Sequence, residues 1–123
     1  MSGIENITGT NNRDLITGDA SNNSINGANG TDTIYGLGGD DIIQGGANNA
    51  GDAVGVYEIL DGGEGVDTIY GGAGNDSIYG GAGDYIDSLY GDAGNDIIRA
   101  GSGNDKVDGG DNNDTVYGDS GED

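Results

Sequence analysis

The sequence contains no cysteine, proline, histidine, tryptophan or phenylalanine, and it has three lysine and arginine residues against 23 aspartates and glutamates. The lack of cysteine excludes a disulfide scaffold. Without histidine or cysteine, the chain cannot build the usual zinc site, a serine triad or a cysteine–histidine pair. We therefore expect that the chain is not an enzyme.

The charge and the hydropathy pattern exclude further classes of function. A formal net charge of −20 argues against nucleic acids and anionic membranes as partners, since both attract clustered lysine and arginine. No apolar run approaches the ~20 residues of a membrane-spanning helix. The first residues, MSGIENIT, lack the basic region and apolar core of a classical signal peptide.

A glycine-rich, hydrophilic composition alone would indicate disorder, because 29 residues are glycine and only 32% are hydrophobic. The sequence is nevertheless periodic: GGEGVDTIY is followed directly by GGAGNDSIY, and most units are nine residues long. The units begin at Gly9, Gly18, Gly27, Gly36, Gly45, Gly62, Gly71, Gly80, Gly91, Ala100, Gly109 and Gly118.

Two positions of the unit are regular in chemistry. Position eight is always aliphatic, at Ile16, Ile25, Ile34, Ile43, Ile69, Ile78, Leu89, Ile98, Val107 and Val116. Position six is almost always acidic, at Asp14, Asn23, Asp32, Asp41, Asp67, Asp76, Asp96, Asp105, Asp114 and Asp123.

The domain organisation that this period predicts is a short lead-in or cap over residues 1–8 and one repeat domain over 9–123. The last unit, 118–123, is truncated, which suggests a piece of a longer protein. Unit 80–90 is stretched, and its position-six residue is assigned to Asp87 rather than Asp84.

Residues 45–61 form an irregular unit with two possible interpretations. We favour two half-turns, the first with Asp52 at position six and Val54 inward, the second with Glu58 and an inward Leu60. The alternative is one unit with an insertion.

The repeat predicts an all-β fold. Frequent glycine excludes helix, whereas triplets such as TIY and TVY favour short strands, and GGxGxD favours a tight turn. Strands this short need hydrogen-bonded neighbours on both sides, which stacked parallel coils provide. Since side chains alternate along a strand, position eight points inward while positions seven and nine point outward. Two units then make one coil of about 18 residues in a two-sheet parallel β-solenoid.

The solenoid needs a source of stability besides its core, because one aliphatic side chain per unit cannot offset the conformational entropy lost by nine residues. Stacked coils also bring position-six aspartates of alternate units together, and such carboxylates repel unless a cation lies between them. Carboxylate and carbonyl oxygens suit Ca²⁺, whereas Mg²⁺ prefers to keep several waters. The turns therefore predict several bound calcium ions.

The units GGEGVDTIY, GGAGNDSIY, GDAGNDIIR and GSGNDKVDG resemble the nonapeptide GGxGxDxUx of RTX (hemolysin-type) calcium-binding repeats, from about Gly9 to Asp123. The resemblance implies a right-handed parallel β-roll in which each ion lies between the turns of adjacent coils. It implies two series of position-six ligands, one on each side of the roll: Asp67, Asp87, Asp105 and Asp123 on one side, and Asp76, Asp96 and Asp114 on the other. In the first half of the chain it implies that Asp14, Asp32 and Asp52 align on one side, with Asn23 and Asp41 on the opposite side. It implies backbone carbonyl ligands at Gly62, Gly63, Gly65, Gly71, Gly72, Gly74, Gly80, Gly81, Gly83, Gly101, Gly103, Gly109 and Gly110.

The sites should differ in strength along the chain. Asn23 removes one charge, and Arg13 places a cation beside a degenerate turn. Glu58 stands in a turn without the usual glycines, so a regular site is not expected there. The strongest sites are expected between Gly62 and Asp114.

The resemblance implies a calcium-folded, non-catalytic module of a larger bacterial protein that leaves the cell through type I secretion and works outside the cell or at its surface. An alternative is a module that binds carbohydrate or a surface, within an extracellular enzyme such as a polysaccharide epimerase or within an adhesin. For that alternative, Tyr70 and Tyr90 are outward-facing neighbours on one sheet. Cross-strand stacking alone also explains these tyrosines, and we favour it.

Overall fold

The fold is an all-β solenoid. The computed structural model describes residues 5–47, 55 and 57–123, and this part of the chain consists of strands and turns without a helix. The described strands are β1 (Glu5–Thr8), β2 (Leu15–Thr17), β3 (Asn23–Asn29), β4 (Thr33–Gly38), β5 (Ile42–Ala47), β6 (Glu58–Glu64), β7 (Thr68–Ala73), β8 (Asp76–Ala82), β9 (Ser88–Ala93), β10 (Ile97–Gly101), β11 (Lys106–Asp108) and β12 (Thr115–Tyr117).

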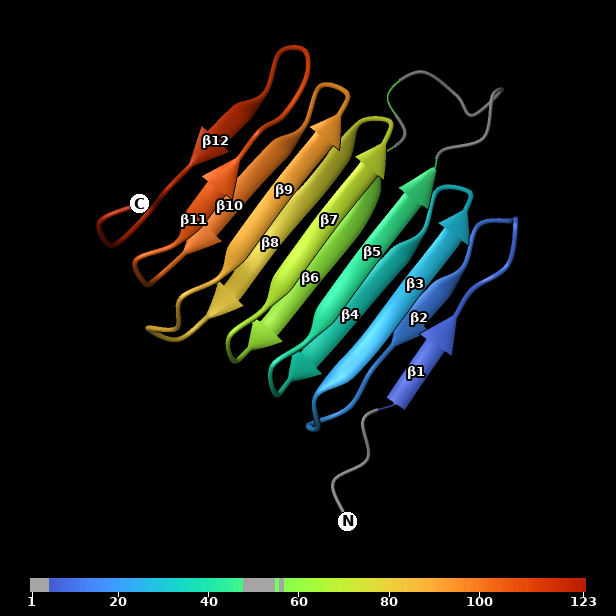
Figure 1. Cartoon of the computed structure of the whole chain (residues 1–123), viewed down its shortest axis with the longest axis horizontal. Coiled ribbons are helices and arrows are strands. Elements are labelled where there is room, and N and C mark those ends of the chain that lie inside the picture. The colour runs from blue at the N-terminus through green and yellow to red at the C-terminus, as the bar shows by residue number, and fades with distance from the viewer. Residues whose placement is uncertain (1–4, 48–54, 56) are drawn as a thin grey trace.

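The strands form two parallel sheets that lie face to face. The odd sheet has the order β1-β3-β5-β7-β9-β11, and the even sheet has the order β12-β10-β8-β6-β4-β2. Every strand therefore pairs with the strand two places along the chain, and the strands of the two sheets run in opposite directions (Figure 1). Regular coils repeat every 18 residues, as between Asp14 and Asp32. The expected two-sheet parallel solenoid is confirmed.

The core is a single row of position-eight side chains from each sheet. Ile34, Leu60 and Ile78 follow one another in the even sheet, and all three are fully buried. Ile25, Ile43, Ile69 and Leu89 do the same in the odd sheet. Burial ends in the last coil, where Val116 is 47% exposed.

The strands are longer than the expected triplets. β8 runs from position six of one unit through the triplet to position three of the next, and β6 does the same. The backbone groups of the glycines pair as well, for example Gly63 with Gly81, because the identical neighbouring coil presents matching donors and acceptors. Each strand continues through the residues that begin the turn.

The irregular unit differs from the expected two half-turns. Ile43 of β5 pairs with Ile69 of β7, and β6 is the one described strand that separates them along the chain. Leu60 of β6 occupies position eight and Glu58 occupies position six. Residues 45–61 therefore correspond to one unit with an insertion, because one strand triplet, in the described residues of this range, closes one half-coil. Asp52 and Val54 lie outside the described residues.

The stretched unit follows the expected assignment. Ser88 pairs with Thr68, which places Asp87 at position six, where it is 4% exposed. Asp84 is exposed on the turn before it. The two additional residues lengthen the turn and leave the register unchanged.

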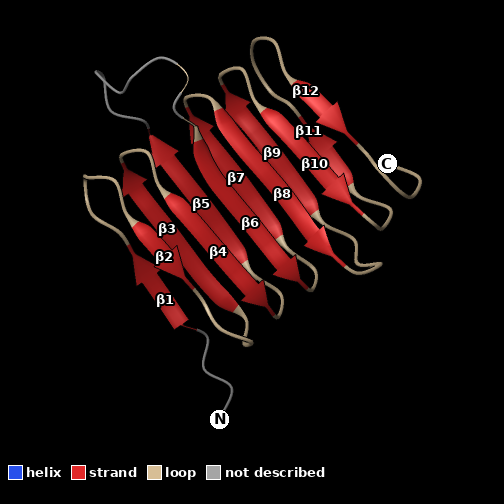
Figure 2. Cartoon of the chain, turned by 180° about the vertical axis from the view of Figure 1, so that it is seen from behind, coloured by secondary structure: helices blue, strands red, loops and turns tan. Residues whose placement is uncertain are grey.

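The turns line up along both ends of the strands, outside the two sheets (Figure 2). Residues 5–8 of the expected lead-in form β1, whose Ile7 pairs with Ile25 at the outer edge of the odd sheet. No helix in the described residues is long and apolar enough to cross a membrane.

Candidate functional site

Two ladders of position-six residues run along the solenoid, one at each end of the strands. Between regular units of each ladder, the backbone N–H of one position-six residue donates to Oδ1 of the next, over 2.7–3.0 Å. We call these the Asp67 ladder (Asn23, Asp41, Asp67, Asp87, Asp105 and Asp123) and the Asp76 ladder (Asp14, Asp32, Glu58, Asp76, Asp96 and Asp114).

The second oxygen of several ladder aspartates is buried and unpaired. Among the described residues, Oδ2 of Asp41, Asp67 and Asp96 accepts no hydrogen bond and is shielded from solvent. Leaving a buried polar group unpaired costs about 1–3 kcal/mol, and more when the group is charged. A row of such oxygens is therefore unfavourable unless something positive binds to them.

Burial also changes the acidity of the ladder. It raises the pKa of Asp67 to about 7 and that of Asp96 to about 6. Burial, followed by the charge of Asp96, raises the pKa of Asp76 to about 7. Without a compensating charge, these aspartates resist ionisation near neutral pH, and a bound cation would restore their ionised form.

Backbone carbonyls lie beside the unpaired oxygens. A Cβ added to Gly71 would lie 2.6 Å from Oδ2 of Asp76 and 2.6 Å from the carbonyl oxygen of Gly91. A Cβ on Gly62 would overlap Oδ2 of Asp67 and lie 2.6 Å from the carbonyl oxygen of Gly80. Glycine at position one thus leaves room for two oxygens beside it: a carboxylate oxygen of its own unit and a carbonyl oxygen of the next coil.

The turn backbone alternates in handedness. Positions two and four have positive φ, for example 105° and 130° at Gly63 and Gly65 and 102° and 127° at Gly72 and Gly74. Residues with alternating φ signs turn successive peptide planes in opposite directions, which arranges polar backbone groups around a concave site. Alanine, leucine or aspartate occupies position two at Ala28, Leu37 and Asp92 despite φ values of 82°, 82° and 69°.

The structure brings together most of the acidic residues that the sequence singled out, with two differences. Asp41 lies in one ladder with Asp67, because Asp41 donates its N–H to Asp67. Glu58 takes the place beside Asp32 that was expected of Asp52. The ladder ends are more open: Asp14 and Asp114 are half-buried, and Asp123 is exposed.

A further set of hydrogen bonds between adjacent coils, at position five, was not predicted from the sequence. Asn95 donates its N–H to Oδ1 of Asn75, and Asn113 donates to Oδ1 of Asn95, over 2.8 and 3.1 Å. Asp40 donates in the same way to Asn22, over 2.9 Å. The recurrence of asparagine and aspartate directly before position six was the signal for it. These bonds hold adjacent turns in register next to the carboxylates.

The donor set suits a hard cation shared between coils. The described residues contain no group of three or more acidic, histidine or cysteine side chains that could hold a metal by themselves. The oxygens that the turns offer to an ion are those of paired carboxylates of adjacent coils and of backbone carbonyls. Such all-oxygen ligation fits Ca²⁺.

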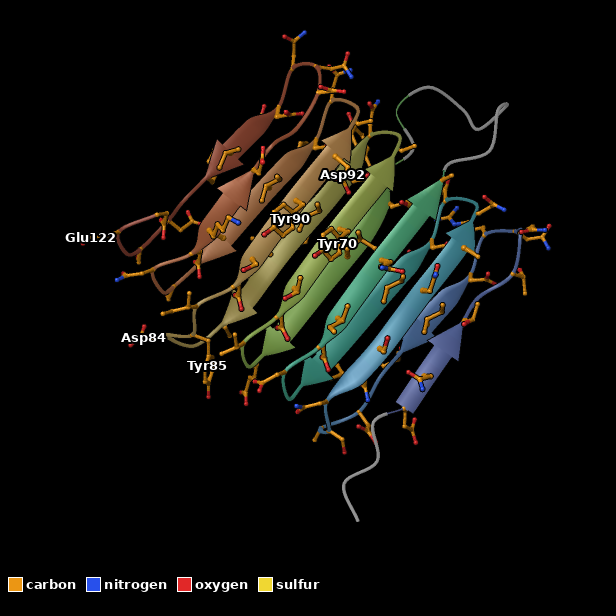
Figure 3. The ribbon with its side chains drawn as sticks, in the orientation of Figure 1. Tyr70, Asp84, Tyr85, Tyr90, Asp92 and Glu122 are labelled. Carbon is orange, nitrogen blue, oxygen red and sulfur yellow. The ribbon has the colours of Figure 1, made fainter. Side chains whose placement is uncertain are left out.

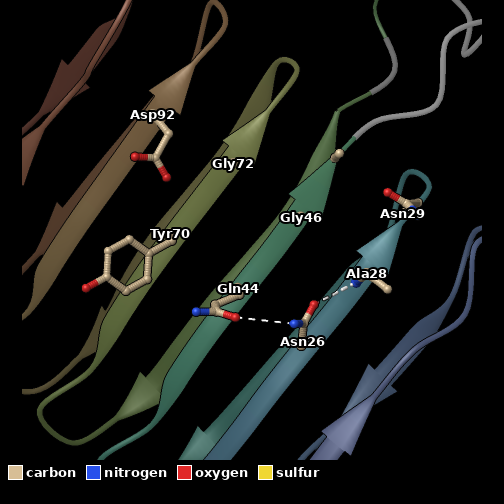
Figure 4. Close-up of a pocket in the computed structure, with 9 residues that line it drawn as sticks. Asn26, Ala28, Asn29, Gln44, Gly46, Tyr70, Gly72 and Asp92 are labelled. Carbon is tan, nitrogen blue, oxygen red and sulfur yellow. Dashed lines mark hydrogen bonds between the residues drawn. The ribbon is translucent and has the colours of Figure 1, made fainter.

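The outer face of the odd sheet carries a separate groove of about 530 Å³ (Figure 4). Asn26 donates from Nδ2 to Gln44 over 3.3 Å on one side of it, and Tyr70 lies on the other. Tyr70 stacks on Tyr90 with ring centroids 4.9 Å apart and planes 9° apart, as predicted for neighbours on this sheet (Figure 3). The side chain of Lys106 donates to the Tyr90 hydroxyl over 3.0 Å.

Comparison with known proteins agrees with this geometry. A family model for the RTX calcium-binding nonapeptide repeat matches four times, over residues 1–34, 26–49, 58–87 and 90–123. Searches of curated proteins and of solved structures found no match. Proteins with these repeats bind several calcium ions and are typically secreted by bacteria. The chain belongs to the family of RTX calcium-binding nonapeptide repeats.

Proposed function

We propose that this chain is a non-catalytic module that completes its fold by binding calcium between adjacent coils. The observation that supports it most is the row of buried carboxylate oxygens without hydrogen-bond partners, at Asp41, Asp67, Asp96 and Asp105. Bound calcium supplies two positive charges between two such carboxylates. The coils bring the oxygens together only when they stack, so binding is coupled to folding.

The proposed ligands follow the two ladders. In the Asp67 ladder, Asp41, Asp67, Asp87, Asp105 and Asp123 would hold ions between consecutive coils. In the Asp76 ladder, Asp14, Asp32, Asp76, Asp96 and Asp114 would do so. The carbonyl ligands proposed are those of Gly62, Gly63, Gly65, Gly71, Gly72, Gly74, Gly80, Gly81, Gly83, Gly101, Gly103, Gly109 and Gly110.

The dependence on calcium fits a protein that works outside the cell. Extracellular calcium modules bind at about 10⁻⁴–10⁻³ M. A chain with this affinity stays unfolded where calcium is scarce and folds where calcium is plentiful. We propose that the module belongs to a larger protein that crosses a type I secretion channel unfolded and then folds outside or at the cell surface.

Isothermal titration calorimetry tests the proposed function. Calcium added to chelator-treated protein should bind at several sites per chain, with a large heat because the chain folds at the same time. Magnesium at the same concentration should give little heat, since it retains its own waters. Equal binding of both ions, or no binding of calcium, would contradict the proposal.

We propose binding of a neutral carbohydrate as a second function, supported by the groove beside Tyr70. Its lining offers an aromatic ring, the paired amides of Asn26 and Gln44, and one carboxylate, Asp92. Sugar rings pack against aromatic side chains through their C–H groups, while amides donate to and accept from hydroxyls. The net charge of −20 repels acidic polysaccharides, so the uncharged ones fit better.

Affinity electrophoresis in gels that contain soluble neutral glucans or galactomannans tests this second function. Tyr70→Ala should abolish the retardation of the calcium-loaded protein. Tyr79→Ala is the matched control, because Tyr79 is equally exposed, at 37%, and lies on the even sheet. Unchanged migration of the wild-type protein in all these gels would reject the second function and leave the calcium proposal intact.

A further inference from the structure

The two sheets space their outward-facing tyrosines differently. In the even sheet, tyrosines and charged residues alternate along position nine, in the order Tyr35, Asp61, Tyr79, Arg99 and Tyr117. Neighbouring strands lie about 4.8 Å apart, so tyrosines two strands apart are separated by roughly 10 Å. In the odd sheet, by contrast, Tyr70 of β7 pairs directly with Tyr90 of β9.

The rings of Tyr70 and Tyr90 are in stacking contact. Their centroids are 4.9 Å apart and their planes differ by 9° (Figure 3). Among the described residues, which include all seven tyrosines, this is the one stacked aromatic pair. Because the two strands are parallel and in register, corresponding carbons of the two rings face each other.

Both rings can be reached from solvent, and the Tyr90 ring is held on two sides. Tyr70 is 37% exposed, and Tyr90 is half-buried. Strand β9 lies between β7 and β11, so Tyr90 has Tyr70 on one side and Lys106 on the other. Lys106 donates to the Tyr90 hydroxyl over 3.0 Å, and its ammonium nitrogen lies 5.1 Å from the ring centroid. These contacts keep the Tyr90 ring against Tyr70.

The composition directs one-electron oxidation to tyrosine. Cysteine, methionine, tryptophan, histidine and tyrosine are the side chains that oxidants attack most readily. This chain has no cysteine, tryptophan or histidine, and its single methionine is Met1. Oxidation of the repeat domain therefore falls on the tyrosines, and the register brings two of them together on adjacent strands.

We propose that Tyr70 and Tyr90 form a site of oxidative cross-linking, at which hydrogen peroxide and a heme peroxidase join the two rings as dityrosine. Each phenol loses one electron and its hydroxyl proton, and the peroxide takes up both electrons and both protons to become two water molecules. The two tyrosyl radicals then form a bond between one Cε atom of each ring. Each of these carbons loses its hydrogen as a proton, which passes through water to the oxygen of the same ring and restores the phenol. The chain loses two hydrogen atoms in total.

The new bond joins two adjacent coils covalently. It closes the segment between Tyr70 and Tyr90 and so restricts the conformations of the unfolded chain, as a disulfide does. The joined coils are those that the N–H of Asp67 and Oδ1 of Asp87 already hold together over 2.9 Å. The cross-link depends on the stacking of the coils and not on a particular metal ion.

Treatment of the folded, calcium-loaded protein with heme peroxidase and limiting hydrogen peroxide tests the site. The monomer, isolated by gel filtration, should show dityrosine fluorescence and a mass lower by two hydrogen atoms, and peptide mapping should join Tyr70 to Tyr90. Tyr70→Phe keeps an aromatic ring in the stack but removes the phenol, so its monomer should lose the fluorescence. Tyr79→Phe is the matched control, because Tyr79 is also 37% exposed, and its monomer should keep the fluorescence.

The distribution of dityrosine between monomer and dimer decides the outcome. Dityrosine found only in dimers would overturn the inference, and so would a Tyr70→Phe monomer that fluoresces as strongly as the wild type. The cross-linked monomer should also unfold at a higher denaturant concentration than the unmodified monomer. An unchanged midpoint would show that the bond does not constrain the coils and would reject its stabilising role.

Discussion

The backbone N–H of Asp67 donates to Oδ1 of Asp87 over 2.9 Å, although 20 residues separate them along the chain. The same bond recurs between Asp87 and Asp105. Asp67 and Asp105 each accept a backbone N–H of the neighbouring coil with Oδ1 and leave Oδ2 unpaired and buried. Under the proposed function the same side chains stack the coils and bind calcium, so a change in one should affect the other.

Asp87→Asn should raise the calcium concentration needed for folding. The amide oxygen can still accept the N–H of Asp67, but the charge facing the cation is lost. We expect the midpoint of calcium-induced folding to rise about tenfold, since an interaction with a charged group contributes about 1.5–3 kcal/mol. Circular dichroism at increasing calcium concentrations measures the midpoint. Asp84→Asn, in the same turn but exposed, should leave it unchanged, and an equal shift in both variants would contradict the account.

Gly62→Ala should prevent folding or weaken it severely, even with calcium. The added methyl would overlap Oδ2 of Asp67 and lie 2.6 Å from the carbonyl oxygen of Gly80. Gly38→Ala is a matched control, because its Cβ would lie 3.7 Å or more from the nearest atoms. Thermal unfolding of both variants at saturating calcium should separate them clearly. Equal melting temperatures would show that position one does not need glycine.

Leu37→Gly should stabilise the chain, although it removes a large side chain. Leu37 has a φ of 82° and is 51% exposed, so glycine relieves backbone strain and sacrifices little burial. A left-handed backbone conformation costs about 1–2 kcal/mol for residues other than glycine. This cost exceeds the roughly 0.5–1 kcal/mol that the additional backbone freedom of one glycine costs on folding. Leu15→Gly, at a leucine that is 74% exposed in β2 and lacks positive φ, should be destabilising. Denaturant unfolding at saturating calcium measures both, and a destabilised Leu37→Gly variant would disagree with this reasoning.

The calcium-free chain should gain β structure as the solution is acidified. The pKa of Asp67 rises from 3.8 to about 7 in the folded chain, mainly through burial. A raised pKa of an acid means that the folded state binds more protons than the unfolded state. The contribution of Asp67 to the stability of the folded, calcium-free chain is therefore complete below pH 3.8 and is lost as the pH rises through about 7. Circular dichroism in chelator between about pH 8 and pH 5 should therefore show increasing order.

Calcium should reverse this pH dependence. Protons compete with the cation for the same carboxylates, so the calcium midpoint should increase on acidification. A double variant, Asp67→Asn with Asp96→Asn, should reduce both effects, whereas Asp84→Asn should not. If acidification reduced the β structure of the calcium-free chain, burial of the ladder carboxylates would not be the factor that dominates its pH dependence.

The sequence predicted those features that repeat in every unit. Position eight fills the core and position six forms the ladders, because the same chemistry recurs at the same place in each coil. The strand length could not be predicted in this way. Glycine lowers strand propensity locally, but Gly63 and Gly81 pair because identical coils lie side by side.

The irregular unit could not be read from the sequence for a different reason. Two arrangements of residues 45–61 satisfied the period nearly equally, and only the pairing of Ile43 with Ile69 distinguishes them. The role of Glu58 followed from that register. Glu58 lies beside Asp76 of the next coil in that register.

Far-UV circular dichroism of chelator-treated protein, with calcium or magnesium added stepwise, is the measurement that tests the central claim most directly. We expect disordered chain without calcium and a cooperative change to β structure at about 10⁻⁴–10⁻³ M calcium, with no comparable change in magnesium. A β spectrum that persists in calcium-free solution, with no metal detected by elemental analysis, would contradict the claim that calcium completes the fold.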